Sequence, residues 1–183
     1  MQQEKDTGTE HPPFRPSGGG ILALLDAPEG DAGVLAEARF YGEEGCEELL
    51  AAVGPGSNLD LERKARGVHL LGLLGCKKLI GLSQDLLKEG LFPVEVSLVY
   101  ALARIDRSVA EQEFAPIIEK DDPERSFLRE HAMRALWVGA SPLLKQKISK
   151  ALQATNDKRL FAELPELLLT PAELKDECAQ GNF

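Results

Sequence analysis

LDLERKARGVHLLGLLGCKKLI, residues 59–80, predicts one helix, a tight turn at Gly75 and the start of a second helix. The same organisation returns along the chain. Gly45-Cys46-Glu47-Glu48-Leu49-Leu50 falls on Gly75-Cys76-Lys77-Lys78-Leu79-Ile80 when the sequence is laid against itself at a shift of 30 residues. Segments that recur at such a period are typical of helical repeat arrays, in which each unit buries its apolar face against its neighbours.

Small or apolar residues hold equivalent places in four successive units. One column contains Ala38, Val68, Leu98 and Ala132. A second column, four residues later, contains Gly42, Gly72, Leu102 and Leu136. Positions four apart share one face of a helix, so the two columns predict a continuous apolar spine. An ordinary helical bundle, whose helix pairs can recur at a similar spacing, is the alternative.

Two local patterns extend this comparison. Asp121-Asp122-Pro123-Glu124-Arg125 introduces an apolar helical segment, and 73–75 ends a unit in Leu-Leu-Gly. With these features, residues 21–155 resemble the short HEAT-like (armadillo-type) class of α-solenoid repeats, which also occurs in phycobilisome bilin lyases. The resemblance implies an all-α fold, an α-α superhelix of about four helical hairpins. It implies no catalytic residue.

The chain divides into three predicted parts. Residues 1–20 mix Pro, Gly and polar residues without periodicity, which predicts a disordered tail. Residues 21–169 form the repeat domain, and 170–183 form a short helix or tail that opens on a capping box. Helices are expected at about 31–42, 45–53, 61–74, 76–89, 93–105, 108–120, 123–138, 142–155 and 157–164.

Charge is unevenly distributed. The net charge is −9, and residues 26–60 hold nine acids against Arg39 alone. This acidic first unit either keeps a terminal repeat soluble or docks a basic partner. The sequence contains neither a membrane-length apolar run nor a visible signal peptide, so we expect a cytoplasmic protein without membrane contact.

The three cysteines suit reduced thiols in such a compartment. Cys46 and Cys76 begin equivalent helices, so we expect them about 10 Å apart, the spacing of packed helices, and too far for a disulfide. No catalytic motif is recognisable, and we expect neither enzymatic activity, cofactor nor metal. An enzyme-associated protein of the bilin-lyase type is the first alternative, with Cys76 the nearest reactive candidate.

Binding to a nucleic-acid backbone is the second alternative. It would use the basic residues of 141–159 together with Arg63, Lys64 and Arg66. The acidic overall charge favours solvated helix faces instead. The basic residues of 141–159 are Lys145, Lys147, Lys150, Lys158 and Arg159.

The preferred hypothesis is a non-enzymatic module that binds another protein or peptide as an adaptor, chaperone or assembly factor. In each unit the helix face opposite the packing column would line a concave groove, where aromatic residues and Arg serve as anchors. If solenoid helices bury more than one face, the same residues belong to the core. The predicted partner-binding residues are Phe40, Arg66, Leu70, Leu73, Tyr100, Arg134 and Trp137.

Overall fold

A computed structural model describes residues 19–27 and 31–154, and all regular structure in these ranges is helical. The predicted all-α class is confirmed for this part of the chain. The elements are η1 (Ile21–Asp26), α1 (Asp31–Phe40), α2 (Gly42–Val53), α3 (Leu61–Leu73), η2 (Lys77–Leu82), α4 (Ser83–Lys88), α5 (Phe92–Ile105), α6 (Arg107–Glu119), η3 (Pro123–Arg125), α7 (Ser126–Trp137) and α8 (Pro142–Ala154).

Several predictions lie outside the described residues. They concern most of the expected tail 1–20, the end of the predicted domain at 155–169 with its short helix, and the expected helix or tail at 170–183. Within the described ranges, no helix combines the length and the apolar character needed to cross a bilayer.

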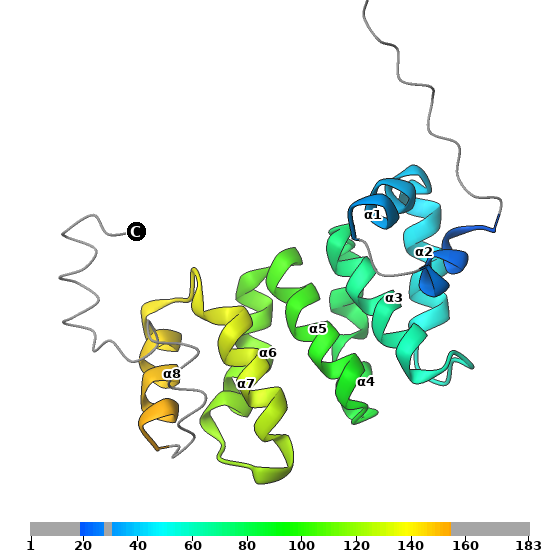
Figure 1. Cartoon of the computed structure of the whole chain (residues 1–183). Coiled ribbons are helices and arrows are strands. Elements are labelled where there is room, and N and C mark those ends of the chain that lie inside the picture. The colour runs from blue at the N-terminus through cyan, green and yellow to red at the C-terminus, as the bar shows by residue number, and fades with distance from the viewer. Residues whose placement is uncertain (1–18, 28–30, 155–183) are drawn as a thin grey trace, which may run out of the picture.

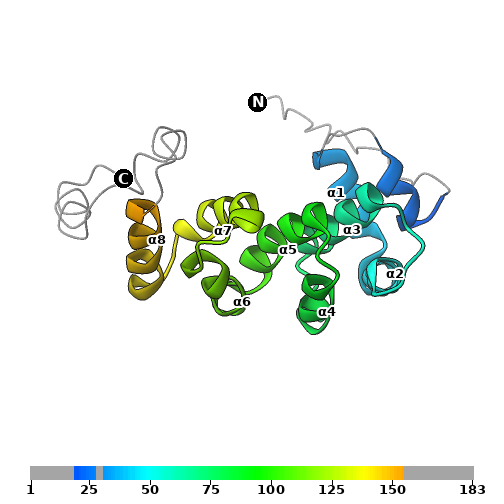
Figure 2. The ribbon, with the colours of Figure 1, turned by 90° about the horizontal axis from the view of Figure 1, so that it is seen from below.

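The helices lie in two rows. Figure 1 shows the chain advancing from α1 at one end of the molecule to α8 at the other. Seen from below in Figure 2, α1, α3, α5 and α7 form one row, and α2, α4 and α6 lie beneath it. In the first row α5 packs against both α3 and α7, while α6 packs against α8. The central helix α5 is therefore covered on two flanks.

Helix starts follow from capping side chains. The Asp60 carboxylate accepts from the Arg63 backbone N–H at 2.9 Å, and the Asp106 carboxylate accepts from the N–H groups of Ser108 and Val109. The Ser141 hydroxyl accepts from the Leu144 N–H at 3.2 Å. These bonds satisfy donors that the first turn of a helix leaves unpaired.

The expected helix 76–89 is not one helix. A 3-10 segment, η2, is followed by the short α4, with exposed Gly81 between the apolar positions. Glycine is a poor helix former, which favours a break here. The Ser83 hydroxyl donates to the Ile80 carbonyl at 2.8 Å across the junction.

The first apolar column is buried as expected, since Ala38, Val68, Leu98 and Ala132 have no exposed surface. The second column is buried in three units and fails in the first. Gly42 is exposed and has a φ of 55°, because α1 ends at Phe40 and the chain turns there. The prediction that Gly42 belongs to the spine is wrong.

The closest approach of α3 and α5 is at Gly72. A Cβ built on Gly72 would lie 2.5 Å from the Ala101 Cα and 2.6 Å from the Ala101 Cβ. Real carbon atoms do not approach this closely, so the two helices pack at this distance only because Gly72 lacks a side chain.

Polar contacts between neighbouring helix pairs join residues that are about 30 positions apart in the sequence. Lys78 pairs with Glu47, 31 residues away, and the Arg107 guanidinium donates to the Leu136 carbonyl, 29 residues away. The Ser141 backbone N–H donates to Glu111, 30 residues away. These contacts bond α2 to η2, and they bond α6 both to α7 and to the residue before α8.

Candidate protein-binding surface

The structure separates the seven predicted partner-binding residues. Leu70 and Trp137 are 3% and 8% exposed and belong to the core, so their assignment to an open groove is wrong. The cause is that α3 and α7 each pack against more than one neighbour. Phe40 is 62% exposed at the end of α1. The remaining four, Arg66, Leu73, Tyr100 and Arg134, are half-buried.

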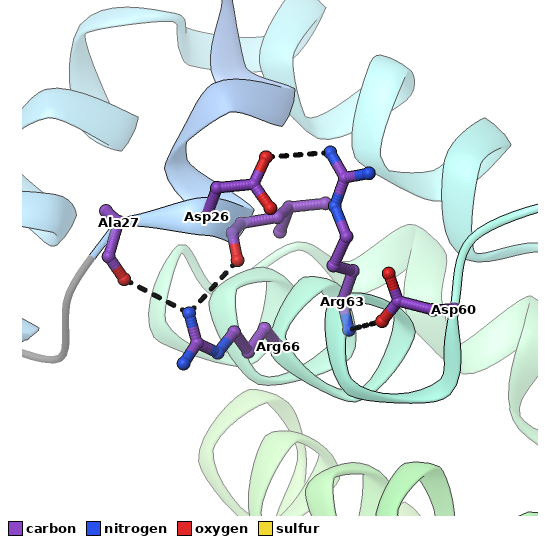
Figure 3. A network of polar contacts seen from close by, with 6 residues as sticks. Asp26, Ala27, Asp60, Arg63 and Arg66 are labelled. Atoms are coloured by element: carbon purple, nitrogen blue, oxygen red, sulfur yellow. Dashed lines mark hydrogen bonds and ion pairs between the residues drawn. The ribbon is translucent and has the colours of Figure 1, made fainter.

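Arg66 holds the first segment of the fold in place. Its guanidinium donates to the carbonyls of Leu25 and Ala27 at 3.1 Å each, and it pairs with Glu62 on its own helix. Figure 3 shows Arg63 and Arg66 reaching from α3 towards the end of η1. These bonds give Arg66 a structural role.

The basic side chains that were proposed to bind phosphate on α3 are likewise engaged in contacts within the chain. Arg63 pairs with Asp26 at 2.9 Å, and Lys64 is buried with Nζ 2.6 Å from a Glu89 carboxylate oxygen. These cations already have acidic partners from their own chain. They therefore give little support to phosphate binding, which requires cations that can neutralise phosphates and displace the counterions condensed on the nucleic acid.

The second basic cluster lies partly outside the described residues, which exclude Lys158 and Arg159. On α8, Lys145 lies over the Trp137 ring with its Nζ 5.4 Å from the centroid. Lys147 pairs with Glu119 at 2.5 Å. The contacts of both lysines lie within the fold.

An aromatic patch lies across α5 and α7, and Tyr100 is its one member among the predicted partner-binding residues. Phe92 meets Phe127 edge to face, with ring centroids 6.3 Å apart, and lies 6.4 Å from His131. Tyr100 meets His131 at 5.9 Å, and the Tyr100 hydroxyl is hydrogen-bonded to His131 Nδ1 at 3.2 Å. We call Phe92, Tyr100, Phe127 and His131 the aromatic patch.

A spacing of four residues on each of two helices brings these rings together. On α5, Phe92, Val96 and Tyr100 are spaced by four residues, and on α7 the same spacing joins Phe127 to His131. Residues four apart share one face of a helix. Following the Val96 and Tyr100 face one turn towards the start of α5 would have found Phe92 from the sequence.

The aromatic patch combines exposed and supported rings. Phe92 and Phe127 are 44% and 60% exposed, whereas Tyr100 and His131 are half-buried beside them. Edge-to-face contacts and the hydrogen bond fix the ring orientations. Two exposed phenyl groups are therefore held on a rigid base, which lowers the entropy lost on binding.

The aromatic patch is uncharged near neutral pH. Burial lowers the pKa of His131, an effect that nearby Glu130 opposes and Arg134 reinforces, so the imidazole is neutral at pH 7. Burial also raises the pKa of Tyr100. Glu130 and Arg134 pair with each other on α7. The ring surfaces of the aromatic patch are therefore neutral.

A buried carboxylate lies on α5 near the start of the aromatic patch. Glu95 is 4% exposed and pairs with Arg125 of η3. Burial raises its pKa above the ordinary value, and the Arg125 charge and hydrogen bond only partly oppose this. Removing a carboxylate from water disfavours its charged form.

We expect Glu95→Gln to gain stability relative to the wild type as pH rises from 4 to 7. The pKa of Glu95 is raised in the folded state, so the protonated side chain contributes stability to the fold below the unfolded-state pKa. This stability is lost as pH rises through the folded-state pKa. Glutamine keeps the shape and cannot ionise. Urea unfolding at both pH values measures the difference, with exposed Glu124→Gln as the control. The expectation would be contradicted if the stability of Glu95→Gln minus that of the wild type were smaller at pH 7 than at pH 4.

Cys46 and Cys76 lie on segments that come together. Both line one pocket between α2 and the turn before η2, and Cys76 contributes to raising the pKa of Cys46. Both thiols are free. Cys76 immediately precedes η2 and does not begin a full helix as expected. In the described ranges no three His, Cys, Asp or Glu side chains gather as a metal site.

No protein-family model, curated protein or solved structure matches this chain. Its function is therefore inferred from the contacts of its own residues.

Proposed function

We propose that this protein binds another protein or peptide without chemistry of its own, as an adaptor, chaperone or assembly factor, and that the aromatic patch is the contact surface. The observation that carries the proposal is the pair of exposed phenylalanines, Phe92 and Phe127, in contact across two helices. Exposed aromatic rings are costly in water and are common anchors of protein interfaces.

The partner that fits the aromatic patch is an amphipathic helix with aliphatic side chains on one face. The charges bordering the patch are internally paired, Glu95 with Arg125 and Glu130 with Arg134, which leaves no net charge for a polar ligand to neutralise. A helix presents apolar side chains at spacings of three and four residues, which suits a surface built from two adjacent helices.

We also propose that the fold is a short HEAT-like α-superhelix. Support comes from the fully buried column that contains Leu98 and from polar contacts that recur at about 30 residues. Helix pairs succeed one another along the molecule (Figure 1). Such arrays offer one extended face built from equivalent helices, and the aromatic patch lies on two of them.

The test begins with selection of helical peptides from a displayed library on the purified wild-type protein. We expect the selected peptide to bind Phe92→Ser/Phe127→Ser about 100-fold more weakly, because two aromatic anchors are lost. Titration by fluorescence anisotropy measures the affinities. Both residues are exposed, so the double variant should keep its circular dichroism spectrum.

Leu143→Ser is the matched control. Leu143 is 63% exposed on α8 and is no part of the aromatic patch, so its loss should leave peptide affinity unchanged. Equal weakening in both variants would show nonspecific adhesion to apolar surface. Failure to select any peptide, or full affinity in the double phenylalanine variant, would also overturn the proposal.

A further inference from the structure

A second feature lies away from the aromatic patch, where α2 passes the turn before η2. The Glu47 carboxylate and the Lys78 ammonium are 2.6 Å apart across this junction. Glu47 follows Cys46, and Lys78 lies two residues after Cys76. The ion pair thus shows, independently of the thiols, that the two cysteine-bearing segments lie side by side.

The two thiols are neighbours in an open pocket. Cys46 is half-buried and Cys76 is 7% exposed. Both line a pocket of about 490 Å³ between α2 and the turn that contains Gly75. Exposed residues form part of the lining, so a small reagent can reach the sulfur atoms.

The pocket is more basic than the rest of this acidic region. Three cations, Arg39, Lys77 and Lys78, line it with a single carboxylate, that of Glu43. Lys77 and Arg39 are exposed at its edge. A reagent that carries carboxylates would therefore be attracted to the dithiol.

We propose that Cys46 and Cys76 form a dithiol modification site that small anionic disulfides, such as oxidised glutathione, convert to an intramolecular disulfide. One cysteine loses its proton to solvent, and its thiolate attacks a sulfur of the small disulfide, releasing one thiol and leaving a mixed disulfide. The second cysteine, also deprotonated, attacks the sulfur of the first cysteine in the mixed disulfide, which forms the intramolecular disulfide and releases the second small thiol. The protein loses two electrons and two protons, and the small disulfide is reduced to two thiols.

The surroundings of Cys46 slow its reaction near neutral pH. Burial, the hydrogen bond with Cys76 and the nearby Glu43 raise the pKa of Cys46 to about 11, against a smaller opposing effect of Lys78. Cys46 therefore keeps its proton near neutral pH, and the exchange should be faster at alkaline pH.

The test treats the native full-length protein with oxidised glutathione and follows its intact mass. We expect the loss of two hydrogen atoms with no retained glutathione, and a crosslinked peptide pair joining Cys46 to Cys76 after digestion. Cys178 lies outside the described residues. Cys178→Ser is the matched control and should react as the wild type does.

Two single variants separate the steps. Cys46→Ser and Cys76→Ser should each retain glutathione on the remaining cysteine, because the resolving thiol is gone. Phenylarsine oxide provides a second measurement on the unaltered pair, since two neighbouring thiols bind its arsenic with release of water. We expect one arsenical per native molecule in Cys178→Ser. A stable glutathione adduct on the wild type, crosslinks through Cys178, or thiols that react only after denaturation would overturn the proposal.

Discussion

Gly72→Val is expected to lower the free energy of unfolding by about 3 kcal/mol, since overpacking a close-packed site displaces whole elements. The new side chain would start 2.5 Å from the Ala101 Cα. The obstacle is backbone, which cannot rotate away as a flexible side chain can. The central helices α3 and α5 would have to separate, and the contacts beside Gly72 would loosen with them. Urea unfolding followed by circular dichroism measures the loss.

Gly33→Ala is the control with the opposite sign. Gly33 lies in α1, and a Cβ there meets nothing within 4 Å. Alanine is the better helix former by up to about 1 kcal/mol, so this variant should be as stable as the wild type or slightly more so. If Gly72→Val and Gly33→Ala unfold at the same urea concentration, the close approach of α3 and α5 is wrong.

Glu89→Gln is expected to destabilise the protein by about 3 kcal/mol, because it leaves a buried ammonium without its counter-charge. The Lys64 side chain is only 5% exposed, and its Nζ lies 2.6 Å from a Glu89 oxygen. The one other acceptor described for it is the Gly54 carbonyl, at 3.3 Å. Lys64 thereby ties α3 both to the residue after α4 and to the end of α2.

Two further variants test whether the cost comes from the orphaned charge. Lys64→Met removes the buried ammonium and leaves Glu89, which is 21% exposed and can be hydrated, so its cost should be much smaller. Asp85→Asn breaks the exposed pair with Lys88 and should cost less than about 0.5 kcal/mol. A larger loss in Lys64→Met than in Glu89→Gln would contradict this account.

Helix positions were predictable from the sequence because they depend on local chemistry. Asp60 and Ser141 cap helices by bonding to backbone a few residues away, and Pro142 opens a helix where its missing N–H costs nothing. The column through Leu98 was predictable for a related reason. A position that must be apolar in every unit leaves a periodic trace.

The division between surface and core was not predictable in the same way. Leu70 and Tyr100 hold equivalent places in their units, yet Leu70 is buried and Tyr100 is half-exposed. The difference depends on which neighbours flank each helix, and the spacing within one helix does not contain this information.

The contacts between helix pairs join residues that are close in sequence, and this affects how the protein folds. Tyr100 reaches His131, 31 residues on, and Glu111 reaches Ser141, 30 residues on. Chains whose contacts are local in sequence close small loops and fold quickly. Each pair of helices can pack as soon as the next pair has left the ribosome, before more distant parts of the chain are synthesised. The fold is thereby suited to assembly in step with translation.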